Sequence, residues 1–255
     1  MMAIAGSLYL LSTAVFCLFC VTIGVRLLLL ARRTGRRPER LLGTGLGLTG
    51  GLGYGILIAV TLTRQALGET PHALLTALGA LGKGLHDLGV VAMLGFVLTV
   101  FRPNDEWAKA LAGAMLAALV AGYFGNAATG GFVHGRAEGF WYWLGFAAIG
   151  TYPVWIATES FLYHRRMRRR SALGLADPVI VNRFLLWGVG AVFSVAAIWT
   201  VSLPALLGLP LEEQRRLSPL VLSITSVWGI GAIASYWLTF FPPVWYRARI
   251  GAAAN

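Results

Sequence analysis

Long apolar segments separated by short polar ones are the feature that most constrains this chain. A bilayer core about 30 Å thick is crossed by about 20 helical residues, so we searched for runs of that length. Such runs are bounded by charges, prolines and interfacial aromatic residues. The predicted spans are residues 8–31, 41–63, 71–101, 107–128, 140–163, 178–203 and 219–241. We therefore expect an all-α integral membrane protein, in which residues 1–255 form a single bundle of seven transmembrane helices.

Composition supports this fold class and argues against a soluble protein. The chain is 57% hydrophobic and only 12% charged, far more apolar than an ordinary soluble domain. A net charge of +11 would suit a nucleic-acid partner on a polar surface, but here the basic residues fall between apolar runs. We therefore expect no nucleic-acid partner. No zinc pattern or phosphate-binding loop is present, and the four histidines are too scattered for a metal or catalytic set, so we expect no metal site and favour an enzyme least. The sequence leaves any cofactor unknown.

The distribution of lysine and arginine predicts the orientation. With the N-terminus outside, most basic residues lie on the inner side, and only a few lie on the outer side. The outer residues would be Arg64, Arg136, Arg215 and Arg216. The inverted topology reverses this bias, so we expect the C-terminus in the cytoplasm and a multi-pass protein of the plasma (inner) membrane. The arginine-rich inner loops are expected to contact anionic lipid.

Three predicted spans begin with a capping residue followed by proline, a pair that is typical of helix N-termini. These pairs are Thr70-Pro71, Asp177-Pro178 and Ser218-Pro219. Pro153 lies near the middle of the fifth predicted span and is expected to kink it, because proline removes a backbone hydrogen bond.

Small residues recur at four-residue spacing in two predicted spans. The second span carries Gly43, Gly47, Gly51 and Gly55, and the fourth carries Gly113 and Gly125 with alanines between them. A stripe of this kind lets a neighbouring backbone come close, which is how membrane helices gain packing contacts. We expect close packing at both stripes, either within the chain or against a second copy or another membrane protein.

Three ionisable residues lie within two turns of the third predicted span. Lys83 and Asp87 are four residues apart and share a helix face, and His86 adjoins Asp87. A rise of about 1.5 Å per residue puts His86 roughly 24 Å from the inner boundary. One interpretation is a polar pocket, open to the outside, that holds a cation, a small molecule or a proton. The other is that Lys83 extends to the outer headgroups while His86 and Asp87 make a structural hydrogen bond to a neighbouring helix.

Two further polar residues are candidates for the same site. Asn126 lies in the fourth predicted span and could line a polar interior. Glu159, in the fifth, could continue a proton path from the cluster. The alternative for Glu159 is that its carboxylate extends to the inner surface and pairs with the arginines that follow it.

Three functions fit these features. The first is a receptor or sensor-like protein with an outward-facing pocket around Asp87 and His86. The second is a proton-coupled transporter or channel that uses Lys83 as well, and the third is an accessory or scaffold subunit. The outline is similar to that of the rhodopsins and receptor-type seven-helix proteins. However, the span 219–241 has no lysine for a retinal Schiff base, so we assign no family.

Overall fold

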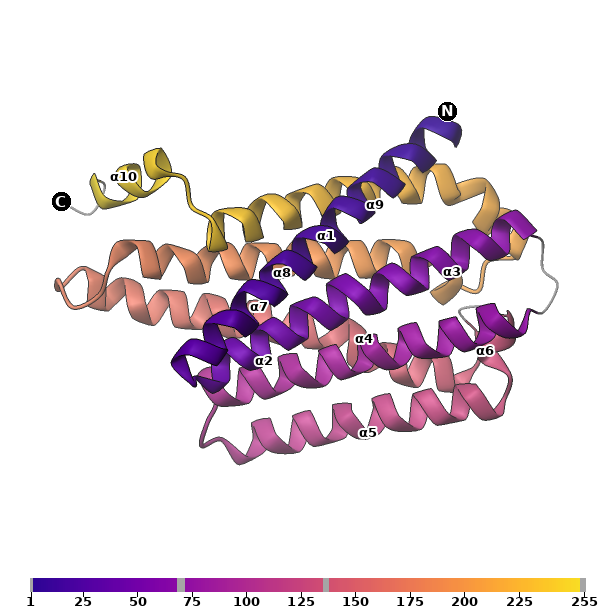
Figure 1. The fold of residues 1–255 in the computed structure, drawn as a ribbon, viewed down its shortest axis with the longest axis horizontal. Coiled ribbons are helices and arrows are strands. Elements are labelled where there is room, and N and C mark those ends of the chain that lie inside the picture. The colour runs from indigo at the N-terminus through magenta and orange to yellow at the C-terminus, as the bar shows by residue number, and fades with distance from the viewer. Residues whose placement is uncertain (1, 68–71, 135–137, 253–255) are drawn as a thin grey trace. The chain divides into compact units, whose positions relative to one another are not determined.

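The chain folds almost entirely into helices. The computed structural model describes residues 2–67, 72–134 and 138–252, and within these ranges it contains no strand (Figure 1). Six helices in the described part are long and apolar enough to cross a membrane. They are Gly6–Thr34, Arg37–Leu67, Ala73–Val100, Glu106–Ala128, Pro178–Leu206 and Leu211–Phe240. The predicted all-helical membrane fold is therefore confirmed.

The fifth predicted span coincides with a helix that is not one of these six. This helix, α7 (Phe140–Ser171), has 32 residues and carries Arg168, Arg169 and Arg170 in its last turn. It contains several tryptophans and tyrosines, which count as only weakly apolar, together with Pro153. Its length nevertheless exceeds the roughly 20 residues that a bilayer core requires.

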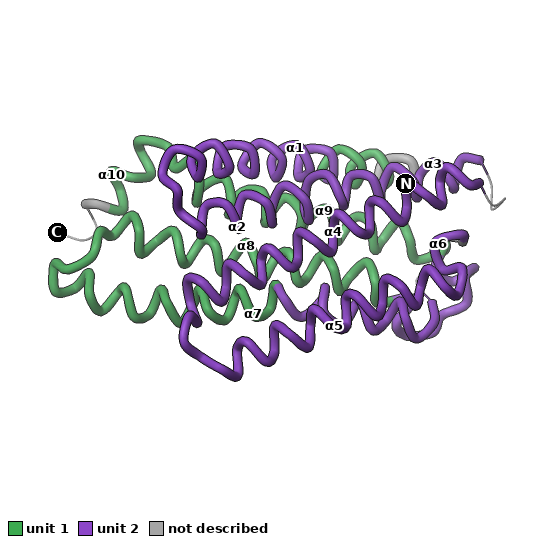
Figure 2. The backbone as a smooth tube through the Cα atoms, turned by 60° about the horizontal axis from the view of Figure 1, so that its bottom comes forward, with its two compact units in different colours: residues 1–12, 153–203, 215–255 green, residues 13–152, 204–214 purple. Residues whose placement is uncertain are grey.

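The chain divides into two compact units (Figure 2). Unit 1 contains residues 1–12, 153–203 and 215–255, and unit 2 contains residues 13–152 and 204–214. One boundary falls at Pro153, the residue that was expected to kink the fifth span. The helix α7 continues through this proline.

Unit 2 contains an element that the sequence analysis did not anticipate. The second predicted span is not a regular α-helix but consists of α2 (Arg37–Leu46), the π-helix η1 (Gly47–Gly53) and α3 (Tyr54–Leu67). Four of the seven residues of η1 are glycine, whose weak preference for the α-helix makes the wider turn easier to adopt. The remaining elements of this unit are most of α1 (Met2–Thr34), α4 (Ala73–Val100), α5 (Glu106–Ala128), the short α6 (Gly131–His134) and the first part of α7.

The predicted glycine stripe of the second span, Gly43, Gly47, Gly51 and Gly55, lies against α1. A Cβ atom on Gly43 would stand 2.9 Å from the carbonyl oxygen of Gly24 and 3.1 Å from the amide nitrogen of Leu28. At Gly51 it would stand 2.6 Å from a methyl group of Val21. The contacts at Gly47 and Gly55 are looser, each at 3.8 Å. The two helices therefore approach closely around Gly24 and Gly43, where no side chain separates them.

The glycines of α5 lie in different packing environments. A Cβ on Gly113 would meet no atom within 4 Å in the described part of the chain, so Gly113 has no packing role there. Gly125 lies directly beneath the ring of Trp141, and Gly122 lies against the backbone of Gly145, with a Cβ distance of 2.8 Å. The close contact of α5 with α7 is thus made by Gly122 and Gly125.

Unit 1 packs aromatic rings onto glycines. It contains the second part of α7, most of α8 (Pro178–Leu206), α9 (Leu211–Phe240) from Arg215, and α10 (Val244–Ala252). The ring of Tyr236 covers Gly190, and the ring centroids of Trp187 and Tyr236 are 5.1 Å apart. These rings fill the space that glycine, which has no side chain, leaves between α8 and α9.

The pair of a capping residue and a proline located one helix start correctly and another wrongly. The backbone N–H of Val179 donates to Asp177 Oδ1 at 2.8 Å, so the predicted cap of α8 is confirmed. The predicted start at Ser218-Pro219 is wrong, because α9 begins at Leu211 and Pro219 lies inside it. The acidic first turn of α9 suits the positive end of a helix and accounts for the earlier start. The pair Thr70-Pro71 lies outside the described residues.

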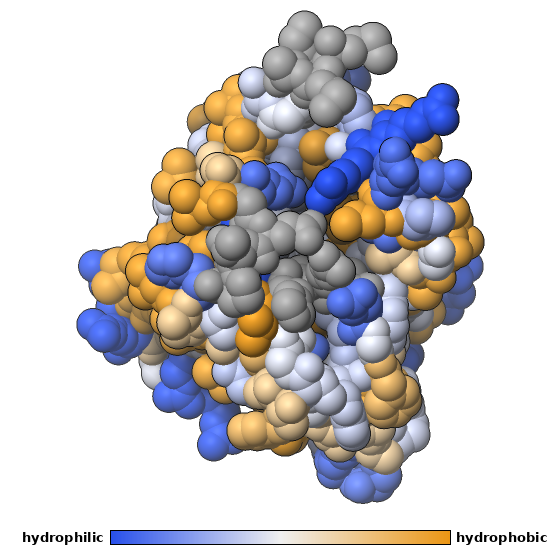
Figure 3. All heavy atoms as spheres, turned by 90° about the vertical axis from the view of Figure 1, so that its right-hand side faces the viewer, coloured by the Kyte–Doolittle hydropathy of each residue, from blue (hydrophilic) through white to orange (hydrophobic). Residues whose placement is uncertain are grey.

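Many large apolar side chains are exposed at the surface, as expected for helices that face lipid. Examples in different helices are Leu18, Phe124 and Val227. Figure 3 shows such side chains in orange on one face of the molecule. Exposed apolar surface on this scale is unusual in a soluble monomer.

The contact of Gly43 with α1 predicts that one added methyl group at this position strongly reduces the stability of the protein. Gly43→Ala would force apart the backbones of α1 and α2, so we expect a loss of about 1–3 kcal/mol in stability. The measurement is thermal unfolding of the purified protein in detergent. Gly113→Ala is the matched control, since its methyl group enters open space and alanine favours the helix. Equal melting temperatures for the two variants would contradict the packing described here.

Candidate functional site

The Lys83, His86 and Asp87 cluster lies where α4 presses against η1. A Cβ on Gly53 would stand 2.5 Å from the backbone nitrogen of His86, and a Cβ on Gly89 would collide with the backbone and hydroxyl of Thr49. The Thr49 hydroxyl lies 3.5 Å from the His86 carbonyl oxygen. The backbone around His86 is therefore held by direct contact with the neighbouring helix.

Lys83 and Asp87 form an ion pair along one face of α4. The Lys83 ammonium donates to Asp87 Oδ2, and the two side chains are only 16% and 11% exposed. The spacing of four residues brings the side chains together on the helix surface. Each charge neutralises the other, which reduces the cost of placing either in an apolar environment. Lys83 therefore pairs with Asp87, and the interpretation in which it extends to the headgroups does not describe this structure.

His86 faces the second oxygen of the same carboxylate. Its Nδ1 atom lies 3.5 Å from Asp87 Oδ1, and the His86 side chain is 12% exposed. Both atoms are buried, and neither has a hydrogen-bond partner in the described part of the chain. Buried polar atoms normally have partners, so two unpartnered polar atoms that face each other require an explanation.

Helices α5 and α7 close the space around the cluster. The Tyr123 hydroxyl of α5 donates to the carbonyl oxygen of Ala80 at 3.2 Å, and its ring edge lies 3.6 Å from the position of a Cβ on Gly84. On α7, a Cβ on Gly145 would stand 3.8 Å from Lys83 Nζ. Tyr123 and Gly145 thus bring α5 and α7 against the part of α4 that carries the ion pair.

Asn126 makes its contacts elsewhere in unit 2. Its side-chain amide packs directly against Gly131 of α6, and its backbone carbonyl oxygen accepts a hydrogen bond of 3.4 Å from the Thr129 hydroxyl. These contacts hold the turn after α5. The structure therefore gives Asn126 a place at the α5–α6 turn.

Glu159 lies in unit 1 and is buried. Only 5% of the residue is exposed, and the indole N–H of Trp155 donates to Glu159 Oε1 at 3.2 Å. Trp155 is one turn earlier on α7, so the bond forms within the helix. The alternative, in which this carboxylate pairs with the arginines that follow it at the inner surface, stays a prediction.

Sequence reasoning missed the residues that bring the second span against α4. Gly45, Thr49 and Gly53 form a second stripe on the second span, facing α4, while the predicted stripe faces α1. The four-residue spacing of these three small residues was the available signal. It was overlooked because the neighbouring all-glycine stripe is more conspicuous.

Comparisons with known proteins give no family for this chain: no protein-family model matches it, and neither a curated protein nor a solved structure does. Within residues 2–67, 72–134 and 138–252, no group of three or more His, Cys, Asp or Glu side chains is arranged to hold a metal ion.

Because Lys83 and Asp87 form an ion pair, we expect that removing one charge destabilises the protein more than removing both. Asp87→Asn leaves a lysine charge in a mostly buried site, so we expect a loss of about 3–5 kcal/mol in stability. The double variant Lys83→Met/Asp87→Asn removes both charges and should recover part of that loss. Thermal unfolding in detergent measures both.

An exposed ion pair provides the control for this comparison. Lys109 Nζ lies 2.6 Å from Glu106 Oε1, and these side chains are 50% and 83% exposed. Glu106→Gln should therefore cost less than about 1 kcal/mol. A double variant that is no more stable than Asp87→Asn would show that the lysine charge needs no partner.

Proposed function

We propose that this chain is a proton-responsive, sensor-like protein that crosses a plasma membrane seven times. The observation that carries the proposal is the buried pair of unpartnered atoms, His86 Nδ1 and Asp87 Oδ1, 3.5 Å apart. A proton on Nδ1 would turn this contact into a charge-assisted hydrogen bond. The low exposure of all three side chains favours a proton over a larger ligand.

The charged and titratable groups around His86 are compatible with the gain of one proton by this residue. On α4 itself they are Lys83 and Asp87, which together are neutral. Helix α5 contributes Tyr123, and the polar side chain that η1 brings to His86 is the hydroxyl of Thr49. Arg64 of α3 is farther along the helix, where it donates to the carbonyl oxygen of Phe132 at 2.6 Å. A protonated His86 would thus face a carboxylate whose other oxygen is already paired.

The close packing of α4 against η1 would couple protonation of His86 to a movement of η1. Gly53 touches the backbone of His86, and Thr49 touches Gly89 one turn later. Any shift of α4 that accompanies a new bond to Asp87 must therefore displace η1. A sensor needs two states that differ in helix packing, and this contact couples the proton to such a difference.

The proposed proton site predicts a pH-dependent stability that requires His86. When the pH falls from about 8 to about 5, histidine gains a proton. The new bond to Asp87 should then stabilise the wild type relative to His86→Gln, because glutamine does not titrate. Thermal unfolding of both proteins across this range, at constant ionic strength, gives the difference.

His72→Gln is the matched control, since His72 is exposed at the start of α4. This variant should follow the wild-type curve. Wild type and His86→Gln with parallel curves over the whole range would contradict the proposal. A ring resonance of His86 that shifts with pH would provide an independent readout.

The seventh crossing is proposed for α7. Its apolar part precedes the arginines of its last turn, as expected for a helix that ends at the cytoplasmic surface. With seven crossings, an outer N-terminus places the C-terminus in the cytoplasm. Six crossings would place both termini on the same side.

Seven crossings predict that the two termini lie on opposite sides of the membrane. Reporter domains that are active on only one side of the membrane, fused to either end of the full chain, should report opposite sides. A second reporter inserted at Leu173, just after α7, should report the cytoplasm. Two termini on the same side would rule out seven crossings.

A further inference from the structure

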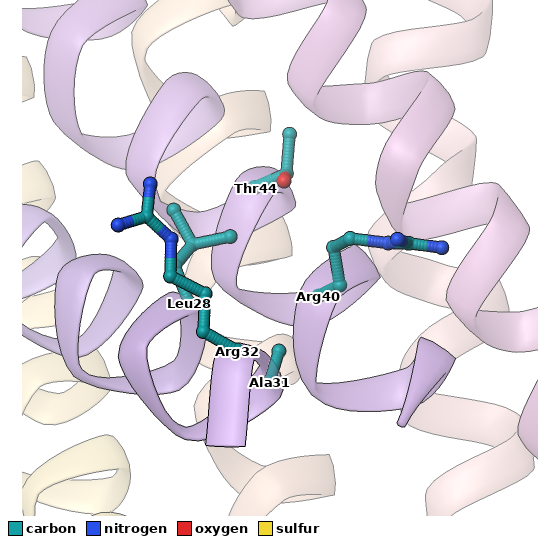
Figure 4. Close-up of a pocket in the computed structure, with 5 residues that line it drawn as sticks. All are labelled: Leu28, Ala31, Arg32, Arg40 and Thr44. Carbon is teal, nitrogen blue, oxygen red and sulfur yellow. The ribbon is translucent and has the colours of Figure 1, made fainter. Parts of the chain in front are cut away.

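A hollow lies between the end of α1 and the beginning of α2 (Figure 4). Its volume is about 340 Å³. Leu28, Ala31 and Arg32 come from α1, and Arg40 and Thr44 come from α2. The lining residues are therefore two aliphatic residues, two arginines and one threonine.

The charge around the hollow is strongly positive. Residues 32–40 contain five arginines and one acidic residue, Glu39, which lies 4.0 Å from Arg36. Within the described residues, neither Arg32 nor Arg40 has an ion-pair partner. Their guanidinium groups point away from each other (Figure 4), and as exposed side chains they can turn toward a shared anion. Arginine binds phosphate with two parallel hydrogen bonds.

The hollow adjoins the connection between two candidate membrane spans. One candidate membrane span ends at Thr34 and the next begins at Arg37, so the connection between them is at a membrane surface. The backbone contact of Gly43 with Gly24 and Leu28 fixes the two walls directly beside the hollow. The site is thus held open by the same packing that joins α1 to α2.

We propose that this hollow binds the phosphate group of an anionic lipid. Arg32 and Arg40 bind the phosphate, Thr44 donates a further hydrogen bond, and Leu28 and Ala31 contact the beginning of an acyl chain. Inorganic phosphate shares the charged chemistry, but it makes no use of the two aliphatic residues. This inference does not depend on proton binding at His86.

The test compares three probes on the full-length protein in a neutral detergent. Phosphatidylglycerol, phosphatidylcholine and inorganic phosphate are added at equal concentrations, and affinity is obtained from the rise in the unfolding temperature. We expect phosphatidylglycerol to stabilise the protein, and the other two to have little effect. Arg32→Gln/Arg40→Gln should weaken phosphatidylglycerol binding by about tenfold or more.

The control removes the same charge from the same connection. Arg33→Gln/Arg37→Gln changes two exposed arginines that do not line the hollow and should weaken binding by less than about threefold. Equal losses in the two double variants would overturn the site, because the attraction would then be diffuse. Equal stabilisation by inorganic phosphate would overturn the lipid as its occupant. All four substituted positions are exposed, so both variants should unfold near the wild-type temperature without lipid.

Discussion

Backbone contact between α4 and η1 is the constraint on which the polar cluster depends. Helices in a bilayer gain little from burying apolar surface against one another, so close packing of small residues supplies much of their attraction. Gly53 and Gly89 provide it here, because a side chain at either position would collide with the partner helix. The contact excludes larger groups from the backbone of His86 and encloses the charges beside it.

Enclosure also determines how these charges are satisfied. Lys83 and Asp87 pair within one helix, which leaves a single carboxylate oxygen for His86. Glu159 in unit 1 receives the indole N–H of Trp155, also from its own helix. In both units a buried carboxylate has a partner one turn away, and so its local bond does not require a neighbouring helix. The cluster on α4 differs in keeping two facing atoms unpaired.

The sequence predicted the parts of the structure that follow from local spacing. Apolar runs located the helices, and the four-residue spacing of Lys83 and Asp87 predicted their proximity. Properties that depend on tertiary packing were harder to predict. Nothing local distinguishes Gly113, which faces open space, from Gly43, which touches α1. The early start of α9 was missed because a proline in the first turns of a helix resembles one at its beginning. The π-helix has no periodic signature beyond its glycines.

That π-helix makes the length of the second span critical. Each residue turns an α-helix by about 100°, and the wider π turns of η1 change this rotation between α2 and α3. Deleting one residue from Gly47–Gly53 would allow the segment to close into a regular α-helix. Because a π turn holds more residues than an α turn, such a deletion would leave the rotation of α3 about the helix axis nearly unchanged. Closing all seven residues into an α-helix without a deletion would instead turn α3 relative to α2 and move Ile56, which now packs on Gly82, away from α4. Natural variants of this protein should therefore tolerate substitutions at exposed positions of η1 and lack one of its residues only where the π turns are also absent.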